Sequence, residues 1–318
     1  HLDAQLGYVH KGTEKLFEHL PATEHLRLAE HVSGDSSVAH ALAYAHAQES
    51  LQGIAVPKRA EYLRLVLAEL ERLVNHFNDI GFIMFDAAFA FGGANGTRLR
   101  ERIMQHCELL SGNRYMRGMV AVGGLTQDIS NYDLSVLSSD LEKIEKDFTE
   151  LMSIAEESIT LANRLRATGK ITLRLATDYG AIGIPLRAVG GRKDARKDHP
   201  YDAYANFDFD IPTEDSGDVY ARFMIRVREV YESIGLITQA IATMPGGAIM
   251  NNGSGVLPAH ATAIGVSEGW RGNIVYVLST NNNAAIDRVK VRDTSFLNWP
   301  VVLHAVLGEM VPDFPLIN

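Results

Sequence analysis

The stretch of the sequence most suggestive of chemistry is HVSGDSSVAH, residues 31–40. It is laid out like a metal-binding loop, because two small side chains, Ser33 and Ser36, bracket a Gly-containing pair and His40 follows four residues later. A loop of this shape that binds a metal uses cysteine thiolates, which are soft ligands. A serine hydroxyl is a hard donor that stays protonated near neutral pH. We therefore expect no metal ligands in this loop.

Other common catalytic and cofactor-binding patterns are absent from the sequence. Cys107 is the only cysteine, so this chain alone forms neither a disulfide nor a multi-thiolate zinc or iron–sulfur site. Neither G-x-G-x-x-G nor G-x-x-x-x-G-K-[ST] occurs, so the sequence offers no common phosphate cradle for a nucleotide. H-E-x-x-H and G-x-S-x-G are absent too, which leaves hydrolase and protease interpretations unsupported.

The composition predicts a globular protein that does not bind nucleic acid. Of the 318 residues, 46% are apolar, and the net charge of -9 opposes attraction to phosphate backbones. The most apolar stretch, residues 81–93, is interrupted by Asp86 and is too short to span a bilayer. The single cysteine favours a cytoplasmic location, and no signal-peptide pattern opens the sequence. The start at His1 and the end at Asn318, within an apolar run, suggest a chain cut at both ends.

Apolar residues at steps of three and four predict three long amphipathic helices. The first begins after Pro57, with charged residues such as Glu69 and Arg72 between its apolar positions. The second runs from about Asp133 to a stop at Gly169, and the third spans roughly residues 218–243. The apolar faces of the three helices can pack against one another, which implies a helix bundle.

The rest of the chain is predicted to consist of loops and short strands. Residues 170–215 are rich in Gly, Pro and turn formers, which indicates an ordered functional loop, and the basic cluster 192–197 within it is predicted to be a solvated surface. Short apolar runs after residue 260, separated by turn signals, predict a small antiparallel sheet. We expect one mainly α (α+β) domain over residues 1–318.

Long motifs link this sequence to a known family. SGDSSVAH (33–40), followed by AYAHAQESLQGIAVPKRAEYLR, resembles the C-G-x-C-S-x-A-H loop and V-P-x-R-A helix of nickel–iron hydrogenase large subunits. The resemblance covers almost the whole chain and is greatest to the energy-converting hydrogenases and the quinone-binding subunit of respiratory complex I. It implies their helix bundle with a small peripheral sheet. The other matching segments are LGYVHKGTEK, LLSGNR, VGGLTQDI, GAIGIPLRAVGGRKDARKDHPYDAY, GDVYARF, EGWRG and SFLNWP.

Serine at both cysteine positions of the family loop argues against a hydrogen-activating centre. The resemblance implies that Ser33, Asp35 and Ser36 line the place where hydrogenases hold nickel and iron. The second cysteine pair of the family falls beyond Asn318, and loss of the first pair alone breaks a four-thiolate site. Complex I shows the same loss and uses the region for quinone chemistry.

The resemblance also implies roles for single residues. Glu14 matches a glutamate that relays protons in hydrogenases, although it also suits the first turn of an ordinary helix; we favour a buried, functional carboxylate. His40 is implied as a donor beside the vacated site, or else is a packing residue. In EGWRG, Glu268 and Arg271 match a hydrogenase motif whose arginine lies over the metals. Arg271 then either pairs with Asp35 or faces water.

Two further segments match family loops that face a ligand or a partner. His10 matches the histidine that reaches toward the quinone headgroup in complex I, and His31 or a nearby residue replaces the tyrosine opposite it. DHPY, residues 198–201, matches a loop that contacts the iron–sulfur subunit, and it also suits a plain turn.

We therefore expect a hydrogenase-like subunit of a redox complex at the cytoplasmic face of a membrane, without a nickel–iron centre and without a membrane span of its own. Glu14, His40 and Arg271 are the expected catalytic residues, and His10, His31, Ser33, Asp35, Ser36 and Glu268 the expected binding residues. The chain itself is expected to hold no cofactor; quinone is a possible ligand, and an iron–sulfur cluster resides in a partner subunit. NADH dehydrogenase-like electron transport, with NAD and quinone binding, is implied for the complex. The alternative is a non-catalytic scaffold subunit, and a working hydrogenase is the least favoured interpretation.

Overall fold

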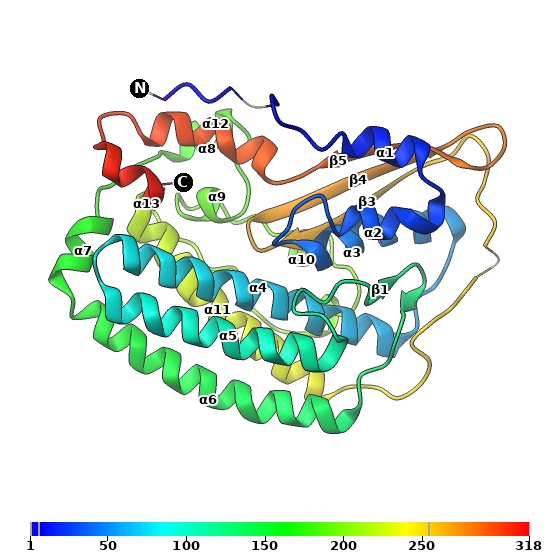
Figure 1. Cartoon of the computed structure of the whole chain (residues 1–318), viewed down its shortest axis with the longest axis horizontal. Coiled ribbons are helices and arrows are strands. Elements are labelled where there is room, and N and C mark those ends of the chain that lie inside the picture. The colour runs from blue at the N-terminus through cyan, green and yellow to red at the C-terminus, as the bar shows by residue number, and fades with distance from the viewer. Residues whose placement is uncertain (1, 6, 254, 318) are drawn as a thin grey trace.

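Four long helices form one side of the computed structural model, which describes residues 2–5, 7–253 and 255–317. They lie alongside one another, with α4 and α11 next to the rest of the molecule and α6 farthest from the sheet (Figure 1). The predicted mainly α (α+β) helix bundle is confirmed. The four helices are α4 (Lys58–Asp86), α5 (Ala90–Ser111), α6 (Asn131–Glu156) and α11 (Val219–Ala242).

Helix α4 is the central element of this bundle, and it is buried on nearly every side. Its apolar stripe, from Leu63 to Phe77, is fully buried as predicted. The charged positions between the apolar ones are buried as well, because Arg64, Glu69 and Arg72 are each at most 1% exposed. A polar helix face was the natural expectation; instead, these side chains find partners of opposite charge on other elements.

Helices α4 and α5 cross closely at three glycines. A Cβ on Gly96 would lie 2.5 Å from the Gly81 Cα, and one on Gly93 would lie 3.1 Å from the Gly81 carbonyl oxygen. Only residues without a side chain allow this approach, which packs the two backbones against each other.

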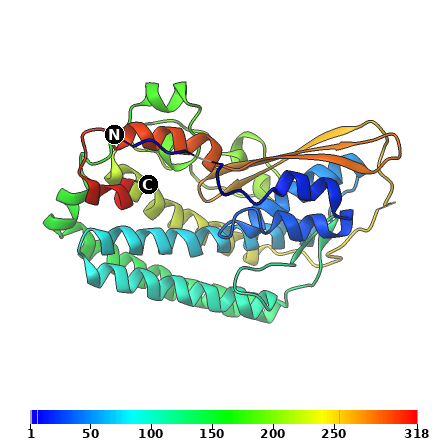
Figure 2. The same cartoon turned by 45° about the horizontal axis from the view of Figure 1, so that its top comes forward.

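A three-stranded antiparallel sheet covers helix α3 (Ser37–Gln52) on the other side of the molecule (Figure 2). The strand order is β3-β4-β5, and Gly269 pairs with Gly272 at the turn between the first two strands. Gly265 is pressed against α3, since a Cβ there would overlap the Ala43 carbonyl oxygen. The predicted sheet is confirmed. Its strands are β3 (Thr262–Gly269), β4 (Gly272–Thr280) and β5 (Ile286–Arg292).

Short elements connect the bundle and the sheet. Helix α1 packs on β5, and α2 packs on α3, so that Phe17, Tyr44 and Tyr276 form a small aromatic core between them. A two-stranded ribbon pairs β1 with β2. The remaining elements are α1 (Thr13–His19), η1 (Ala22–Glu24), α2 (His25–Ala29), β1 (Val120–Ala121), β2 (Gly124–Leu125), α7 (Ile159–Leu165), α8 (Leu173–Asp178), α9 (Ile184–Arg187), α10 (Ala195–Asp198), η2 (Tyr204–Asn206), α12 (Ser295–Ala305), η3 (Val311–Asp313) and α13 (Phe314–Ile317).

Two local predictions were wrong. The helix predicted from Asp133 to Gly169 is broken after Glu156, because the Ser158 hydroxyl accepts the Leu161 N–H and starts a second helix, α7. The basic cluster 192–197 is not a solvated surface throughout, since Arg196 and Asp194 are each 1% exposed.

Within the described ranges, every helix is too short or too polar to cross a bilayer.

The helix crossing gives a first testable prediction. Gly96→Ala should lower the free energy of unfolding by about 1–3 kcal/mol, because the added methyl group meets backbone rather than a movable side chain. Gly235→Ala on α11 is the matched control: beyond the adjacent residues and the local helix backbone, no atom lies within 4 Å of the added Cβ, so helix propensity alone should raise stability by up to about 1 kcal/mol. Chemical denaturation measures both. Equal effects of the two changes would contradict the close crossing.

Candidate functional site

The loop of residues 33–35 borders a polar cavity of about 450 Å³. Its walls come from α4, α5, the segment after α5 and the turn between β3 and β4, so distant parts of the sequence build it. Ser33, Asp35 and Arg271 are the predicted site residues that line it. The other lining residues are Gly34, Glu71, Val74, Asn75, Asn78, Asp79, Arg100, Arg114, Tyr115, Met116 and Trp270.

Asp35 is the centre of the contacts at this cavity. Its carboxylate accepts hydrogen bonds from Ser33 Oγ at 2.8 Å and Ser36 Oγ at 3.4 Å. Arg271 Nη1 donates to Asp35 Oδ1 at 3.1 Å, and Arg271 Nη2 contacts the second oxygen. Of the two alternatives expected for Arg271, the pairing with Asp35 is therefore the one that the structure contains. Both side chains remain about one-third exposed, so the ion pair faces the cavity and water.

These residues do not suit the bimetallic centre that the hydrogenase loop implies. Both serine hydroxyls donate to Asp35, so they act as hydrogen-bond donors rather than as anionic ligands. In the part of the chain that the structure describes, no three His, Cys, Asp or Glu side chains are placed to hold a metal ion. The donor set is hard and partly neutral, whereas a nickel–iron centre needs soft, charged thiolates.

Glu71 is a cavity residue that the sequence did not reveal. It is 7% exposed, and its two carboxyl oxygens accept the backbone N–H groups of Val38 at 2.6 Å and Ala39 at 3.0 Å. Glu71 thus caps the start of α3 in place of Ser36, whose side chain makes no cap bond. Burial, together with the nearby Asp35 charge, raises the pKa of Glu71 to about 8.

A second cavity, of about 460 Å³, adjoins the first and is mainly apolar. The two share Asn78, Asp79, Trp270 and Arg271, so these residues stand at the junction. Arg271 stacks over the Trp270 ring, with 4.0 Å from the guanidinium carbon to the ring centroid. Both tryptophans of the sequence, Trp270 and Trp299, line this second cavity. Its apolar walls include Phe82, Ile83, Ile171, Ile184, Val219, Val301, Val302, Leu316 and Ile317.

Two of the expected catalytic residues lie away from the polar cavity. His40 is fully buried and hydrogen-bonds with the Tyr276 hydroxyl at 2.9 Å and Asp293 at 3.1 Å, which is the packing alternative. Glu14 is not the buried carboxylate that we expected. It is partly exposed, forms an ion pair with Lys290, and accepts the Val291 N–H at 3.2 Å. It therefore joins α1 to β5.

The two histidines expected at a quinone headgroup are exposed and do not line either cavity. His10 precedes α1, and His31 contacts the Arg27 carbonyl through Nδ1 at 2.6 Å. Lys11 joins their two segments, because its ammonium donates to the carbonyl of His31 at 3.0 Å. The structure thus brings the segments together but does not direct the rings at a shared ligand.

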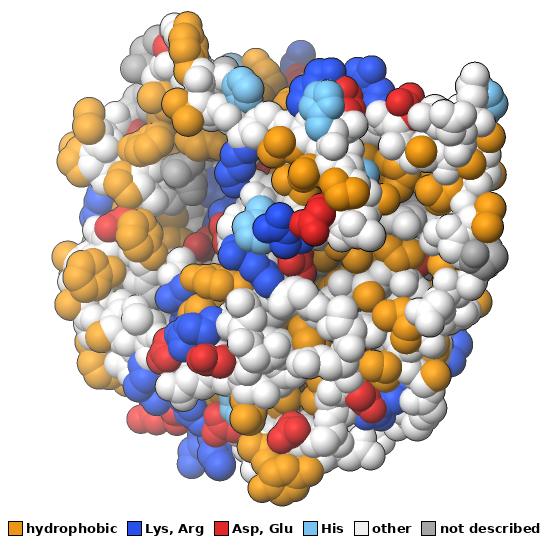
Figure 3. Space-filling model, turned by 45° about the vertical axis from the view of Figure 1, so that its right-hand side comes forward, with side chains coloured by type: hydrophobic (Ala, Val, Ile, Leu, Met, Phe, Trp, Pro, Cys, Tyr) orange, Lys and Arg blue, Asp and Glu red, His pale blue; other side chains and the backbone are white. Residues whose placement is uncertain are grey.

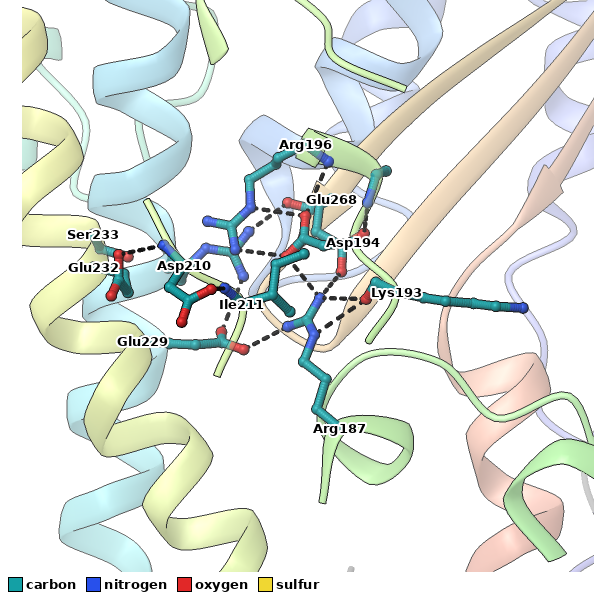
Figure 4. Close-up of polar contacts among 12 residues, drawn as sticks. Arg187, Lys193, Asp194, Arg196, Asp210, Ile211, Glu229, Glu232, Ser233 and Glu268 are labelled. Carbon is teal, nitrogen blue, oxygen red and sulfur yellow. Dashed lines mark hydrogen bonds and ion pairs between the residues drawn. The ribbon is translucent and has the colours of Figure 1, made fainter. Parts of the chain in front are cut away.

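Glu268 belongs to a buried ionic network beneath the cavity rather than to its lining. Arg187 is at the centre of this network and contacts Glu229 and Glu268 at 2.5 Å and Asp194 at 2.8 Å (Figure 4). The backbone N–H of Ala195 also donates to Glu268, at 3.0 Å. The network therefore ties α9, α10, α11 and β3 together.

The same network extends to helix α4. Arg72 donates to Glu69 and Glu229, and Arg196 donates to Glu69 and Asp194. Burial raises the pKa of Glu268 to about 7, with a further contribution from the Asp194 charge. Burial also acts to raise the pKa of Glu229. The charge of Arg187 outweighs this effect and holds the pKa of Glu229 well below its usual value.

Charges on the protein surface are mixed in sign. On the face shown in Figure 3, Lys and Arg side chains lie among Asp and Glu side chains. For the described residues on this face, that pattern gives no continuous basic stripe of the kind that binds a phosphate backbone.

Comparison with known proteins identifies the family. Residues 86–264 match the family described as the 49 kDa subunit of respiratory-chain NADH dehydrogenase. The chain is 31% identical to NADH-quinone oxidoreductase subunit 4 of Thermus thermophilus, over 98% of this chain and 83% of that protein. The carbon monoxide-induced hydrogenase of Rhodospirillum rubrum is 30% identical, over 99% of this chain and 88% of its own length. This chain belongs to the family of complex I and hydrogenase-like subunits.

A further relative is much longer than this chain. Formate hydrogenlyase subunit 5 of Escherichia coli is 31% identical over 99% of this chain, which spans only 55% of that protein. The family resemblance predicted from the serine-containing loop is confirmed by these matches.

The buried network gives a second prediction. Arg187→Gln should lower the free energy of unfolding by about 3–5 kcal/mol, because it leaves Glu229, Glu268 and Asp194 with too little compensating charge. Arg192→Gln is the matched control in the same loop; its partner Asp210 is exposed, so the loss should stay below about 1 kcal/mol. Urea denaturation separates the two. A small effect of Arg187→Gln would show that the network is dispensable.

Glu71 gives a prediction about pH. Because the pKa of Glu71 is about 8 in the folded protein and 4.5 for an ordinary glutamate, the native state binds an extra proton between these two pH values. The stability that this provides is present at low pH and is lost as the pH rises toward 8, with a slope of up to about 1.4 kcal/mol per pH unit. Glu71→Gln should make the decline between pH 6 and 8 shallower, as thermal unfolding would show. Glu61→Gln, in the first turn of α4, where Glu61 pairs with the exposed Lys58 and does not line the polar cavity, should leave the wild-type decline in place.

Proposed function

We propose that this chain is a subunit of a membrane-associated electron-transfer complex and that it binds a quinone-type redox carrier instead of a nickel–iron centre. The observation that carries the proposal is the pair of adjoining cavities, one polar and one apolar, which meet at Trp270 and Arg271. An amphipathic carrier has the same division, with a polar ring and an apolar tail. Ligand pockets in proteins span roughly 300–1,000 Å³, and each cavity alone is within that range.

The polar cavity supplies the chemistry that such a ring needs. Reduction of a quinone places negative charge on its oxygens, and a positioned cation stabilises that charge. Arg271 is partly exposed to the cavity and is held in place by Asp35 and by stacking on Trp270. Arg100 lines the same cavity and makes no ion pair with any described residue. Both guanidinium groups can therefore donate to a reduced ring.

The expected partner is an iron–sulfur subunit that delivers electrons from outside the chain. Support comes from the location of the polar cavity, which is bordered by the partly exposed loop of residues 33–35 and by Tyr115, itself 41% exposed. A cluster bound on this face would lie next to the carrier. The peripheral location at the cytoplasmic face and any link to NADH oxidation are properties of the complex that we propose by analogy with the NADH-quinone oxidoreductase relatives.

A scaffold subunit is the second candidate. It is favoured by the positions of Glu14, His40, His10 and His31, none of which lines the polar cavity in the described structure. In that case the fold would be retained for its interfaces, and the cavities would bind no carrier.

Intrinsic fluorescence distinguishes the two candidates, because both tryptophans line the apolar cavity. Titration of the purified chain with a short-chain ubiquinone analogue should give saturable quenching, and Trp299→Phe should remove part of that signal. Arg271→Gln should weaken binding about 10-fold or more, the cost of losing a charged hydrogen bond. The control, Arg288→Gln on exposed β5, should bind as the wild type does. Quenching that never saturates, in the wild type, would favour the scaffold.

A further inference from the structure

Glu71 differs from the other carboxyl groups at the polar cavity because it forms no ion pair with any residue that the structure describes. Asp35 is paired with Arg271, and Asp79 is paired with Arg226 at 3.0 Å. Within the described chain, the carboxyl group of Glu71 is hydrogen-bonded only by the backbone N–H groups of Val38 and Ala39. Carboxyl groups in one cavity that differ in this way, two of them ion-paired and the third not, are arranged for different tasks.

Resting on the function proposed above, we propose that Glu71 is the residue that donates a proton to a quinone-type carrier reduced in the polar cavity. The geometry supports this assignment in two ways. The side chain is buried but lines the cavity, so a bound ring can approach it. The two N–H groups at the start of α3 also remain in place after the proton has left, and they stabilise the resulting carboxylate.

The charged groups around Glu71 are consistent with a neutral acid. From the loop side, Asp35 faces it, and this charge opposes ionisation. On α4 itself, the Arg72 charge favours ionisation, but the Arg72 guanidinium is already bonded to Glu69 and Glu229. From α5, the nearby Cys107 thiol is buried and its pKa is raised to about 12, so it stays neutral. The N–H bonds from Val38 and Ala39 lower the pKa of Glu71, but burial outweighs them and raises it to about 8, so the proton is present near neutral pH.

Asn75 holds this arrangement together. Its side-chain amide donates to the carbonyl of Asp35 and to that of Glu71, each at 2.8 Å. The loop that carries Asp35 and the helix that carries Glu71 are therefore fixed relative to each other, one on each side of the same amide group.

The proposed step balances as follows. Two electrons arrive singly from a one-electron donor of the iron–sulfur class and reduce the carrier ring. One carbonyl oxygen of the ring takes the proton of the Glu71 carboxyl group, so that a new O–H bond forms as the old one breaks. Protons from the solvent, carried by water in the open cavity, supply the second proton and then reprotonate Glu71, so the reduction takes up two protons from solution in all. The products are the hydroquinone and the restored acid.

A single-turnover experiment on the purified chain tests the assignment. A bound short-chain ubiquinone analogue is reduced by a photoreduced one-electron donor, and hydroquinone formation is followed from about pH 6 to 9. The wild-type rate should fall above pH 8 as Glu71 loses its proton. Glu71→Gln should be slower by on the order of 100-fold and should lack this pH step. Glu71→Asp, which keeps an acid, should restore the step, and Glu61→Gln should match the wild type.

Binding measured by tryptophan quenching separates the possible failures. If the analogue binds and Glu71→Gln keeps the wild-type rate and pH profile, this assignment is wrong while the proposed function stands. If the analogue does not bind, both fall. If the variants do not fold, infrared spectroscopy of the wild-type protein tests the assignment instead. A protonated carboxyl band that titrates near pH 8 and shifts when the analogue binds supports it. The lack of any protonated carboxyl band at pH 7 overturns it.

Discussion

The structure depends on charges that are buried and satisfied by one another. Arg187 alone contacts three carboxylates: Asp194, just before α10, Glu229 on α11 and Glu268 on β3. Two further ion pairs, Arg72 with Glu229 and Arg196 with Glu69, connect this network to α4. Removing charged groups from water is costly, and only complete pairing in good geometry repays that cost. The network therefore constrains the approach of the bundle to the sheet more strictly than apolar packing alone, which tolerates many arrangements.

This constraint places the candidate site. The turn between β3 and β4, which carries Trp270 and Arg271, follows directly after Glu268, and Glu268 is anchored in the network. The Arg72 side chain also donates to the carbonyls of Glu268 and Gly269, so that α4 holds the same turn. A rigid base of this kind lets an exposed guanidinium keep its position beside Asp35. The segment that resembles a hydrogenase loop thus forms a hydrogen-bonded rim of a polar cavity.

Much of the fold could be predicted from the sequence, because the apolar stripes of the three long helices and the alternating strands are local patterns. The break at Ser158 was missed, since a capping hydroxyl inside a continuing apolar pattern gives only a weak local signal. Burial of Glu69, Arg72 and Arg196 could not be predicted either. Their partners lie far away in the sequence, as Glu229 does for Arg72, and a charged residue without a visible partner is expected to face water.

The site was predicted in part. The cost of an uncompensated guanidinium left two alternatives for Arg271, a pair with Asp35 or a position facing water, and the structure contains the pair. Glu71 was missed because it is one more charged residue on an amphipathic helix, and only the fold places it at the start of α3. The central claim is that this cavity holds a carrier ring. A density map of the complex with a bound quinone analogue tests it most directly: we predict ring-shaped density beside Arg271 and Glu71, whereas nickel and iron seated at Ser33 and Ser36, or a cavity closed by side chains, would contradict it.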